Sequence, residues 1–314
     1  MNEAVSLFAG PGGLCLGAEA MGVKPFGIEW DANACATRRA AGLLTVEGDV
    51  RDYGPADFPG CTTLTAGPPC QTFSTTGNGK GRASFNEVRH IAARMVQGKS
   101  VDWMLSDLSD ERTGLVLEPL RWVLEAHRSG TPYRNILLEQ VPTVQPVWDL
   151  FATYFQGLGY SVVTGVLRAE QYGVPQTRKR AVLLASLDRD AQMPDPIHAP
   201  WTRSGLTDCR TMADVLDRPT PFTVISNYGT GGDASKRGRR SHDEPAFTVT
   251  GKISRNRLVA PDGTELPRLT HAEAGALQGF PVDHPWAGRD IPQQIGNAVP
   301  PPLAEHLIKS LLAL

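Results

Sequence analysis

The chain has 314 residues, of which 41% are hydrophobic and 20% are charged, and its formal net charge is -2. These proportions are typical of soluble globular proteins and exclude an intrinsically disordered chain. A net charge near zero also excludes a uniformly basic nucleic-acid coat, so a nucleic-acid surface would have to be a local cluster of Lys and Arg. No apolar run approaches the roughly 18 residues that span a bilayer, so we expect no membrane partner.

The five cysteines are odd in number, and none forms a Cys-x-x-Cys pair with metal spacing. The apolar residues 4–8 are too few for the core of a signal peptide, and no basic segment precedes them. We therefore expect a reduced cytoplasmic protein with no bound metal.

Short apolar runs alternate with helix-like stretches over the first two-thirds of the chain. Strands of four to six residues separated by helices predict an α/β fold, with a mostly parallel sheet and helices on both faces. The expected strands cover 5–8, 25–29, 62–66, 135–139 and 181–185, with another just before Asp49, and the expected helices cover 14–21, 31–41, 115–127 and 144–158.

From 188 to 267 the composition changes to Pro, Gly, Ser, Thr and Arg, without a convincing helical period. This change predicts a separate small, irregular lobe or a long insertion. Helix-like patterns return at 269–277 and 302–312. We therefore divide the chain into a catalytic domain at 1–187, the lobe at 188–267 and a return to the catalytic domain at 268–314.

The first expected strand runs into Gly10-x-Gly12-Gly13, and a helix follows. A turn of this kind lets the backbone approach a nucleotide cofactor at a helix N-terminus, although such turns also occur in proteins without a ligand. The spacing departs from Gly-x-Gly-x-x-Gly, which disfavours a nicotinamide dinucleotide.

Acidic residues end the next two strands. Glu29 can bind the hydroxyls of a cofactor ribose, and Trp30 beside it can stack on an adenine. Alternatively Glu29 only caps the next helix, a role that Asp31 can also fill. Asp49 can accept a hydrogen bond from an exocyclic amine, or it is a solvated turn residue.

Two prolines precede Cys70, directly after an apolar strand. They restrict the backbone and present one thiol at the carboxyl end of that strand, where α/β sheets bind their ligands. Most free cysteines are buried and inert. This setting favours a nucleophile at Cys70, whereas the other four cysteines lack it.

Glu139 ends another apolar strand, which brings it near Cys70 if the two strands are neighbours. A carboxyl group held protonated there by desolvation could donate to a base nitrogen, whereas in water it would be only a rim carboxylate. Alternation predicts that Gln176, Arg178 and Arg180 share one face of a strand, unless this is a solvated basic strand.

These segments resemble the ordered motifs of the DNA cytosine-5 methyltransferase family, from end to end of the chain. Eight matches in the family's order are not expected by chance. The matching segments are 8–14 (FAGPGGL), 29–31 (EWD), 48–50 (GDV), 67–71 (GPPCQ), 139–141 (EQV), 176–180 (QTRKR), 268–270 with 277–281 (RLT, LQGFP) and 294–299 (QIGNAV).

The resemblance implies a Rossmann-like S-adenosylmethionine-dependent methyltransferase fold with a small target-recognition lobe. It implies methyl transfer from S-adenosylmethionine to C5 of a flipped cytosine in a specific duplex DNA sequence, with Cys70 adding covalently to C6 and Glu139 on the ring. Gln176, Arg178 and Arg180 would hold the base and the backbone. The implied cofactor residues are Phe8, Gly10, Gly12, Gly13, Leu14, Glu29, Trp30, Asp49, Pro69, Asn297 and Val299.

A basic cluster in the lobe fits double-stranded DNA as the partner. Seven Lys and Arg side chains face only Asp243 and Glu244 between 235 and 258, which indicates a phosphate footprint unless this is a solvated loop. We expect a monomeric enzyme of the restriction–modification type, in a bacterial cell or encoded by a phage. The seven residues are Lys236, Arg237, Arg239, Arg240, Lys252, Arg255 and Arg257.

Three features depart from the family. Gln140 stands where the family usually has Asn, which leaves the positioning of Glu139 open. The stretch 76–112, where the family has a mobile loop, is long, and we expect a helical insertion at about 84–97. The lobe is short, which predicts a short recognition site or few contacts.

Three other functions fit fewer of these features. An RNA cytosine-5 methyltransferase would keep Cys70 and Glu139 but need little lobe, so the lobe favours DNA. A catalytically inactive DNA-binding relative is disfavoured by the same two residues, although Gln140 leaves it open. A nicotinamide enzyme has only the glycine turn in its favour.

Overall fold

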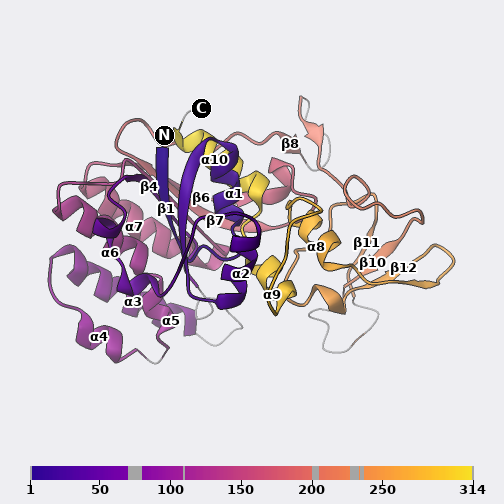
Figure 1. The fold of residues 1–314 in the computed structure, drawn as a ribbon, viewed down its shortest axis with the longest axis horizontal. Helices are drawn as coiled ribbons and strands as arrows, with labels where there is room; N and C mark the ends of the chain where they lie inside the picture. Colours follow the sequence, from indigo (N-terminus) through magenta and orange to yellow (C-terminus); the bar gives the residue numbers. More distant parts are fainter. Residues whose placement is uncertain are drawn as a thin grey trace.

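The computed structural model describes residues 2–69, 80–108, 110–199, 205–226, 233 and 237–312. They form a large α/β core and a smaller lobe (Figure 1). A seven-stranded sheet forms the centre of the core. Its strands are β1 (Asn2–Leu7), β2 (Val23–Glu29), β3 (Thr45–Glu47), β4 (Cys61–Ala66), β5 (Asn135–Gln140), β6 (Ser161–Arg168) and β7 (Lys179–Ser186).

The strand order is β3-β2-β1-β4-β5-β7-β6. Neighbouring strands from β3 to β5 run parallel, and β7 runs antiparallel to both β5 and β6. The prediction of a mostly parallel α/β sheet is therefore confirmed. β6 was not predicted, because Thr164 and Gly165 interrupt its apolar run.

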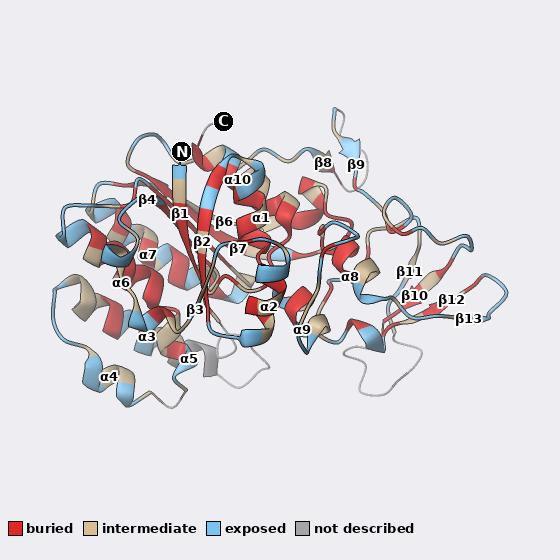
Figure 2. Ribbon diagram, in the orientation of Figure 1, coloured by how far each residue is buried: buried red, intermediate tan, exposed pale blue. Residues whose placement is uncertain are grey.

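Helices cover both faces of the sheet, as predicted, and the central strands are buried between them (Figure 2). In β5, Ile136 and Leu138 lie in one core and Leu137 lies in the other, because successive strand side chains alternate between faces. The first core includes side chains of α3 (Lys80–Val96), α6 (Glu118–Arg128) and α7 (Gln145–Gly157), and the second includes those of α1 (Gly13–Ala20) and α10 (Pro301–Leu312).

Three further helices belong to the core. The expected helix at 115–127 is split, because α5 ends at Leu115 and α6 begins at Glu118. α3 confirms that the stretch expected to be helical at 84–97 forms a helix. The three further helices are α2 (Ala32–Ala40), α4 (Asp102–Ser106) and α5 (Arg112–Leu115). The single-turn 3₁₀ helices are η1 (Val50–Asp52), η2 (Pro55–Asp57), η3 (Pro142–Val144) and η4 (Ala169–Tyr172) in the core and η6 (Ile253–Arg255) in the lobe.

The lobe contains a four-stranded antiparallel sheet of order β11-β10-β12-β13. It was not predicted, because strands of two or three residues are too short to show a period of two. Its strands are β10 (Thr223–Ile225), β11 (Arg239–Ser241), β12 (Arg257–Val259) and β13 (Glu265–Leu266), and a separate pair is formed by β8 (His198–Ala199) and β9 (Thr207–Asp208).

A third core joins the lobe to α8 (His271–Leu277) and α9 (Ile291–Asn297). Leu258 of the lobe is buried in it together with Leu277 of α8 and Ile295 of α9. The two helices predicted near the end of the chain are α8 and α10, whereas α9 was not predicted. Among the described residues, no helix is long and apolar enough to cross a membrane.

Candidate active site

The turn between β1 and α1 has an unusual backbone. Phe8 has φ 54°, and Gly10 and Gly12 have φ 54° and 109°. A residue other than glycine at positive φ costs about 1 kcal/mol or more and is most often found at functional sites. A β-carbon added at Gly13 would lie 1.9 Å from the carbonyl oxygen of Val299. The turn therefore packs directly against the segment between α9 and α10.

Glu29 is buried at the end of β2 and is held by backbone N–H groups. Gly10 N donates to Oε2 at 2.8 Å, and Trp30 N and Asp31 N both donate to Oε1 at 2.9 Å. Burial raises the pKa of this carboxyl, although the three N–H groups act against the shift. The cap of α2 is Asp31, which accepts from Asn33 N at 2.9 Å. Glu29 instead ties the end of β2 to the glycine turn.

Two further residues of the expected cofactor site lie at the surface. The indole of Trp30 is 67% exposed. Asp49 caps η1 by accepting from Arg51 N, and it pairs with the Arg51 guanidinium at 2.5 Å. This hydrogen-bonded pair holds the pKa of Asp49 below its usual range, so the carboxyl is ionised.

The remaining expected cofactor residues differ in exposure. Leu14 and Val299 are buried in the second core. Asn297 is exposed, and its Oδ1 accepts from Gln293 Nε2 at 2.7 Å. Pro69 is half-buried and is the last described residue after β4.

β4 and β5 are neighbours, so the condition for bringing Glu139 near the segment of Cys70 is met. The two strands pair in parallel, with Ala66 opposite Leu138. A β-carbon added at Gly67 would lie 3.8 Å from Oε2 of Glu139. Cys70 itself lies outside the described residues, three positions further along the chain.

Glu139 is a buried carboxyl that forms an ion pair with Arg180 of β7. Arg180 Nε lies 2.8 Å from Glu139 Oε1. Burial raises the pKa of Glu139, and the positive charges of Arg180 and Arg178 oppose this shift. The net direction favours the protonated form more than in water.

The expectation that Gln176, Arg178 and Arg180 share one face of a strand is wrong, because β7 begins only at Lys179. Gln176 is buried where the chain bridges to Ala246 of the lobe. Its Nε2 donates to Gln278 Oε1 and, at 2.8 Å, to Leu277 O, while its Oε1 accepts from Val249 N at 2.8 Å.

Arg178 is also buried, and its guanidinium binds three carbonyl oxygens. It donates to Val249 O at 2.9 Å, to Gly296 O at 2.9 Å and to Ala298 O at 3.1 Å. Burial and the nearby Arg180 lower its pKa. Arg178 therefore connects β7 to the lobe and to the end of α9, and only Arg180 of the three contacts Glu139.

The family model of the C-5 cytosine-specific DNA methylases matches residues 3–105, 106–221 and 219–313. The chain belongs to this family. It is 28% identical to Type II methyltransferase M.NlaX of Neisseria lactamica, over 100% of this chain and 97% of that protein. It is 25% identical to Type II methyltransferase M.NgoMIV of Neisseria gonorrhoeae, over 98% and 96% of the two chains.

Two solved structures share the fold of this DNA methylase. A Dnmt2 methyltransferase of S. pombe matches with a TM-score of 0.69 and 16% identity, over 100% of this chain and 99% of that one. A putative DNA modification methyltransferase encoded within an E. coli prophage matches with a TM-score of 0.64 and 20% identity, with the same coverage. The fold is therefore the Rossmann-like fold of S-adenosylmethionine-dependent methyltransferases, and the chain is a DNA cytosine-5 methyltransferase.

Family membership implies S-adenosylmethionine as the methyl donor, and the glycine turn of this methyltransferase fits such a group. A β-carbon at Gly10 would meet no atom within 4 Å, so the backbone there borders open space. The exposed indole of Trp30 and the buried carboxyl of Glu29 stand on the adjoining strand end. These are an aromatic face and an acceptor of the kinds that bind an adenine and a ribose.

The seven basic lobe residues of the methyltransferase do not form one group. Lys236 lies outside the described residues. Arg257 pairs with Glu265 at 2.9 Å, which compensates its charge. Arg240 faces the catalytic core across a cavity, and its guanidinium donates to Pro245 O and Ala246 O. The members that are exposed are Arg239, Lys252 and Arg255, and Arg237 is half-buried.

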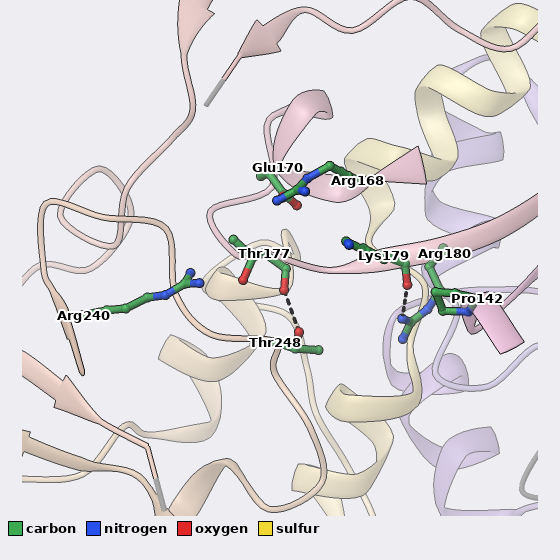
Figure 3. A pocket seen from close by; sticks show the side chains of 8 residues that line it. All are labelled: Pro142, Arg168, Glu170, Thr177, Lys179, Arg180, Arg240 and Thr248. Atoms are coloured by element: carbon green, nitrogen blue, oxygen red, sulfur yellow. Dashed lines mark hydrogen bonds and ion pairs between the residues drawn. The ribbon is translucent and has the colours of Figure 1, made fainter. Parts of the chain in front are cut away.

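The cavity beside Arg240 is lined in part by residues of the methyltransferase that were not predicted as site residues. It has a volume of about 470 Å³ and lies beside β7 (Figure 3). Lys179 lies within the basic segment 176–180, and that segment could have identified it as a site residue. No motif in the sequence around Arg168 or Thr248 indicates a role for either residue. The lining residues are Pro142, Arg168, Glu170, Thr177, Lys179, Arg180, Arg240 and Thr248.

Proposed function

We propose that this enzyme methylates C5 of cytosine within a specific sequence of duplex DNA, with the base turned out of the stack and Cys70 as covalent nucleophile. The observation that carries the proposal is the buried Glu139 carboxyl, which is paired with Arg180 at the sheet edge where β4 continues toward Cys70. A buried carboxyl at a neighbouring strand end is the arrangement that acid catalysis beside a thiol requires.

Cytosine C5 is a weak nucleophile, and addition of a thiolate at C6 makes it reactive. Cys70 would form a bond from Sγ to C6, which places the electron pair in the ring and at C5. Because a free thiol has a pKa of about 8.5, the thiolate needs a positive environment. The guanidinium groups of Arg178 and Arg180 provide positive charge at this end of the sheet.

Glu139 would donate its proton to N3 of the cytosine while Cys70 adds. Burial raises its pKa, so the protonated form needed for donation is more accessible than in water, and Arg180 Nε, 2.8 Å from Oε1, positions the carboxyl and stabilises the carboxylate once the proton has left. S-adenosylmethionine supplies the methyl group for C5 from its sulfonium. C5 then loses its proton to a base, the bond from Sγ to C6 breaks, and Glu139 recovers its proton from N3.

The target base is stacked inside a duplex, and turning it out costs a few kcal/mol. Contacts between the lobe at 188–267 and the DNA would offset that cost and select the sequence. The basic lobe residues that are exposed, among them Lys252 and Arg255, support this assignment. We further propose that the enzyme acts as a monomer, which light scattering with and without DNA tests.

Bisulfite sequencing of DNA from cells that express the protein tests the activity and reads out the recognition site in one measurement. We expect cytosine methylation at one sequence with the wild type and none with Cys70→Ser. An RNA of the same sequence is the competing substrate. Absence of methylation by the wild type, or a preference for the RNA, would contradict the proposal.

The covalent step has its own test with duplex DNA that contains 5-fluorocytosine at the target. Fluorine blocks the final loss of the C5 substituent, so a stable protein–DNA adduct should form only when S-adenosylmethionine is supplied. Cys61→Ser is the matched control, because Cys61 begins β4, the strand that precedes Cys70 in the sequence, and burial raises its pKa to about 12. We expect it to form the adduct normally. An adduct on any cysteine other than Cys70 would refute the mechanism.

A further inference from the structure

A basic cavity separates the start of β7 from the lobe (Figure 3). We use this name for the space of about 470 Å³ between Arg168 and Lys179 on the core side and Arg240 on the lobe side. Arg180 also lines it and is the residue that pairs with Glu139. The cavity is therefore continuous with the candidate active site through a single side chain.

The charges in the basic cavity are not balanced. Glu170 is the one acidic residue among those that line it, and it already accepts from Arg168 Nε at 2.8 Å and from Arg178 N at 3.1 Å. Within the described part of the chain, neither Lys179 nor Arg240 has a carboxylate at ion-pair distance. Among the described residues, two of the positive charges that line the cavity thus have no ion-pair partner.

The lobe side of the cavity is held in place by hydrogen bonds. The Arg240 guanidinium donates to Pro245 O at 2.7 Å and to Ala246 O at 2.9 Å, and it stacks on the Phe247 ring with 4.5 Å between its carbon and the ring centroid. Partial burial lowers the pKa of Arg240, which means that its charge is incompletely solvated there. An anion in the cavity would offset that cost.

The two walls are also tied to each other. Thr248 Oγ1 of the lobe donates to Thr177 O at 2.6 Å, and Thr177 N donates to Ala246 O at 2.9 Å. A site whose donors are already positioned loses little conformational entropy when a ligand binds. Apart from Pro142, the lining side chains are charged or carry a hydroxyl group, so the cavity offers no aromatic face for a base to stack on.

We propose that the basic cavity binds one phosphodiester of the DNA backbone beside the target cytosine, with Lys179 and Arg240 as its anchors. Guanidinium and ammonium groups with neighbouring hydroxyls are the donors that proteins use for backbone phosphates. The inference rests on the proposed function. Arg180 both lines the cavity and pairs with Glu139, so a phosphate bound in the cavity would lie beside the proposed catalytic carboxyl. Neither Lys179 nor Arg168 belongs to the residues assigned above to the reaction.

The test uses Lys179→Gln as the main variant, because Lys179 is exposed and its loss should not disturb folding. Arg240→Gln is the second variant, and Lys309→Gln on the exposed side of α10 is the matched control for the loss of one charge. Binding to a duplex with the methylated sequence is measured over a range of salt concentrations. We expect each cavity variant to lower the salt slope by about one unit and to weaken binding roughly tenfold at 0.1 M salt. The control should change neither.

A second measurement identifies the phosphate. Neutral methylphosphonate linkages are placed one at a time around the target cytosine, and each duplex is tested with the wild type and with Lys179→Gln. At one linkage next to the target, we expect the neutral group to weaken binding by the wild type. The same neutral group should cause no further loss of affinity in Lys179→Gln, which already lacks the contact. This non-additivity is the signature of a direct contact.

Full additivity at every linkage would overturn the inference, as would unchanged salt slopes in both cavity variants. A loss confined to one base pair, with an unchanged slope, would show that the cavity reads a base instead. These outcomes are separate from failure of the proposed function. That failure would be seen as absence of methylation by the wild type, which does not involve the variants.

Discussion

Gln140 and Pro68 connect the ends of two neighbouring strands: Nε2 of Gln140 donates to the Pro68 carbonyl oxygen at 2.6 Å. The other end of the same amide accepts from Val141 N. The residue that departs from the family's usual Asn therefore spans from β5 to the segment that leads into Cys70. It also adjoins Glu139, so one side chain links both halves of the proposed catalytic pair.

Gln140→Ala should lower the single-turnover methylation rate roughly fivefold, because one hydrogen bond of this kind contributes about 1 kcal/mol. Gln140→Asn, whose side chain is one methylene shorter, should have a rate between those of the wild type and Gln140→Ala. Affinity for S-adenosylmethionine should stay unchanged, and the exposed Gln156→Ala on α7 serves as control. A wild-type rate in Gln140→Ala would show that this contact does not position the reacting groups.

The raised pKa of Glu139 predicts a specific pH dependence of stability. A carboxyl whose pKa is higher in the folded state binds its proton more tightly there, so its contribution to stability is present at low pH and is lost as the pH rises through the raised pKa. The neutral Glu139→Gln lacks this dependence. Urea unfolding of both proteins between pH 4 and pH 8 should therefore show the wild type losing stability relative to the variant as the pH increases. The opposite slope would mean that the ion pair with Arg180 outweighs burial.

Cofactor binding and catalysis should separate among variants. Trp30→Ala removes an exposed aromatic face and should weaken S-adenosylmethionine binding roughly tenfold, and Asp49→Ala should weaken it at least as much. Glu139→Gln should lose orders of magnitude in turnover with cofactor affinity almost unchanged. Calorimetric titration with the cofactor, beside methylation rates, distinguishes these effects. Equal losses of cofactor affinity in all three would show that the two sites have been confused.

Gly13→Ala should be strongly destabilising, because its β-carbon would lie 1.9 Å from the carbonyl oxygen of Val299. Forcing atoms into a packed site costs about 1–3 kcal/mol. Gly157→Ala at the end of α7 is the matched control, since its β-carbon would meet nothing within 4 Å. Urea midpoints should fall for the first and stay level or rise for the second. Equal midpoints would mean that the segment at Val299 moves away without cost.

The basic lobe residues should differ in their effect on DNA binding. Single substitutions of the seven should identify at least one phosphate contact, whose loss weakens binding to all DNA sequences and lowers the salt slope by about one unit. They should also identify at least one residue that reads a base, whose loss costs roughly 1–3 kcal/mol of binding free energy at one position of the site. Arg257 should matter least, because Glu265 already compensates its charge. Binding to a randomised-site library at two salt concentrations measures both effects. If none of the seven substitutions changes the DNA affinity, the salt slope of binding or the recognition sequence, the lobe does not select the DNA sequence.

Most strands and helices of the α/β core, and the sheet edge that carries the candidate active site, could be predicted from the sequence. Apolar runs such as 135–139 are local signals, because a strand buried on both faces must be apolar at every position. Glu139 ends one such run and the segment of Cys70 follows another, and parallel strands bring their carboxyl ends to one edge. The glycine turn was predictable for the same reason, since positive φ at Gly10 and Gly12 is a local demand of the backbone.

Contacts between distant segments were decided only by the tertiary structure. Arg178 looked like a residue of the basic strand, yet it binds carbonyl oxygens of residues 71 and more positions away. The hydrogen bond from Gln140 to Pro68 depends on how β4 and β5 pair, and the position of Lys179 and Arg240 around one cavity depends on how the lobe packs against the core. A polar side chain has no periodic signal that reveals its partner, because its hydrogen bonds depend on three-dimensional neighbours and not on its own segment.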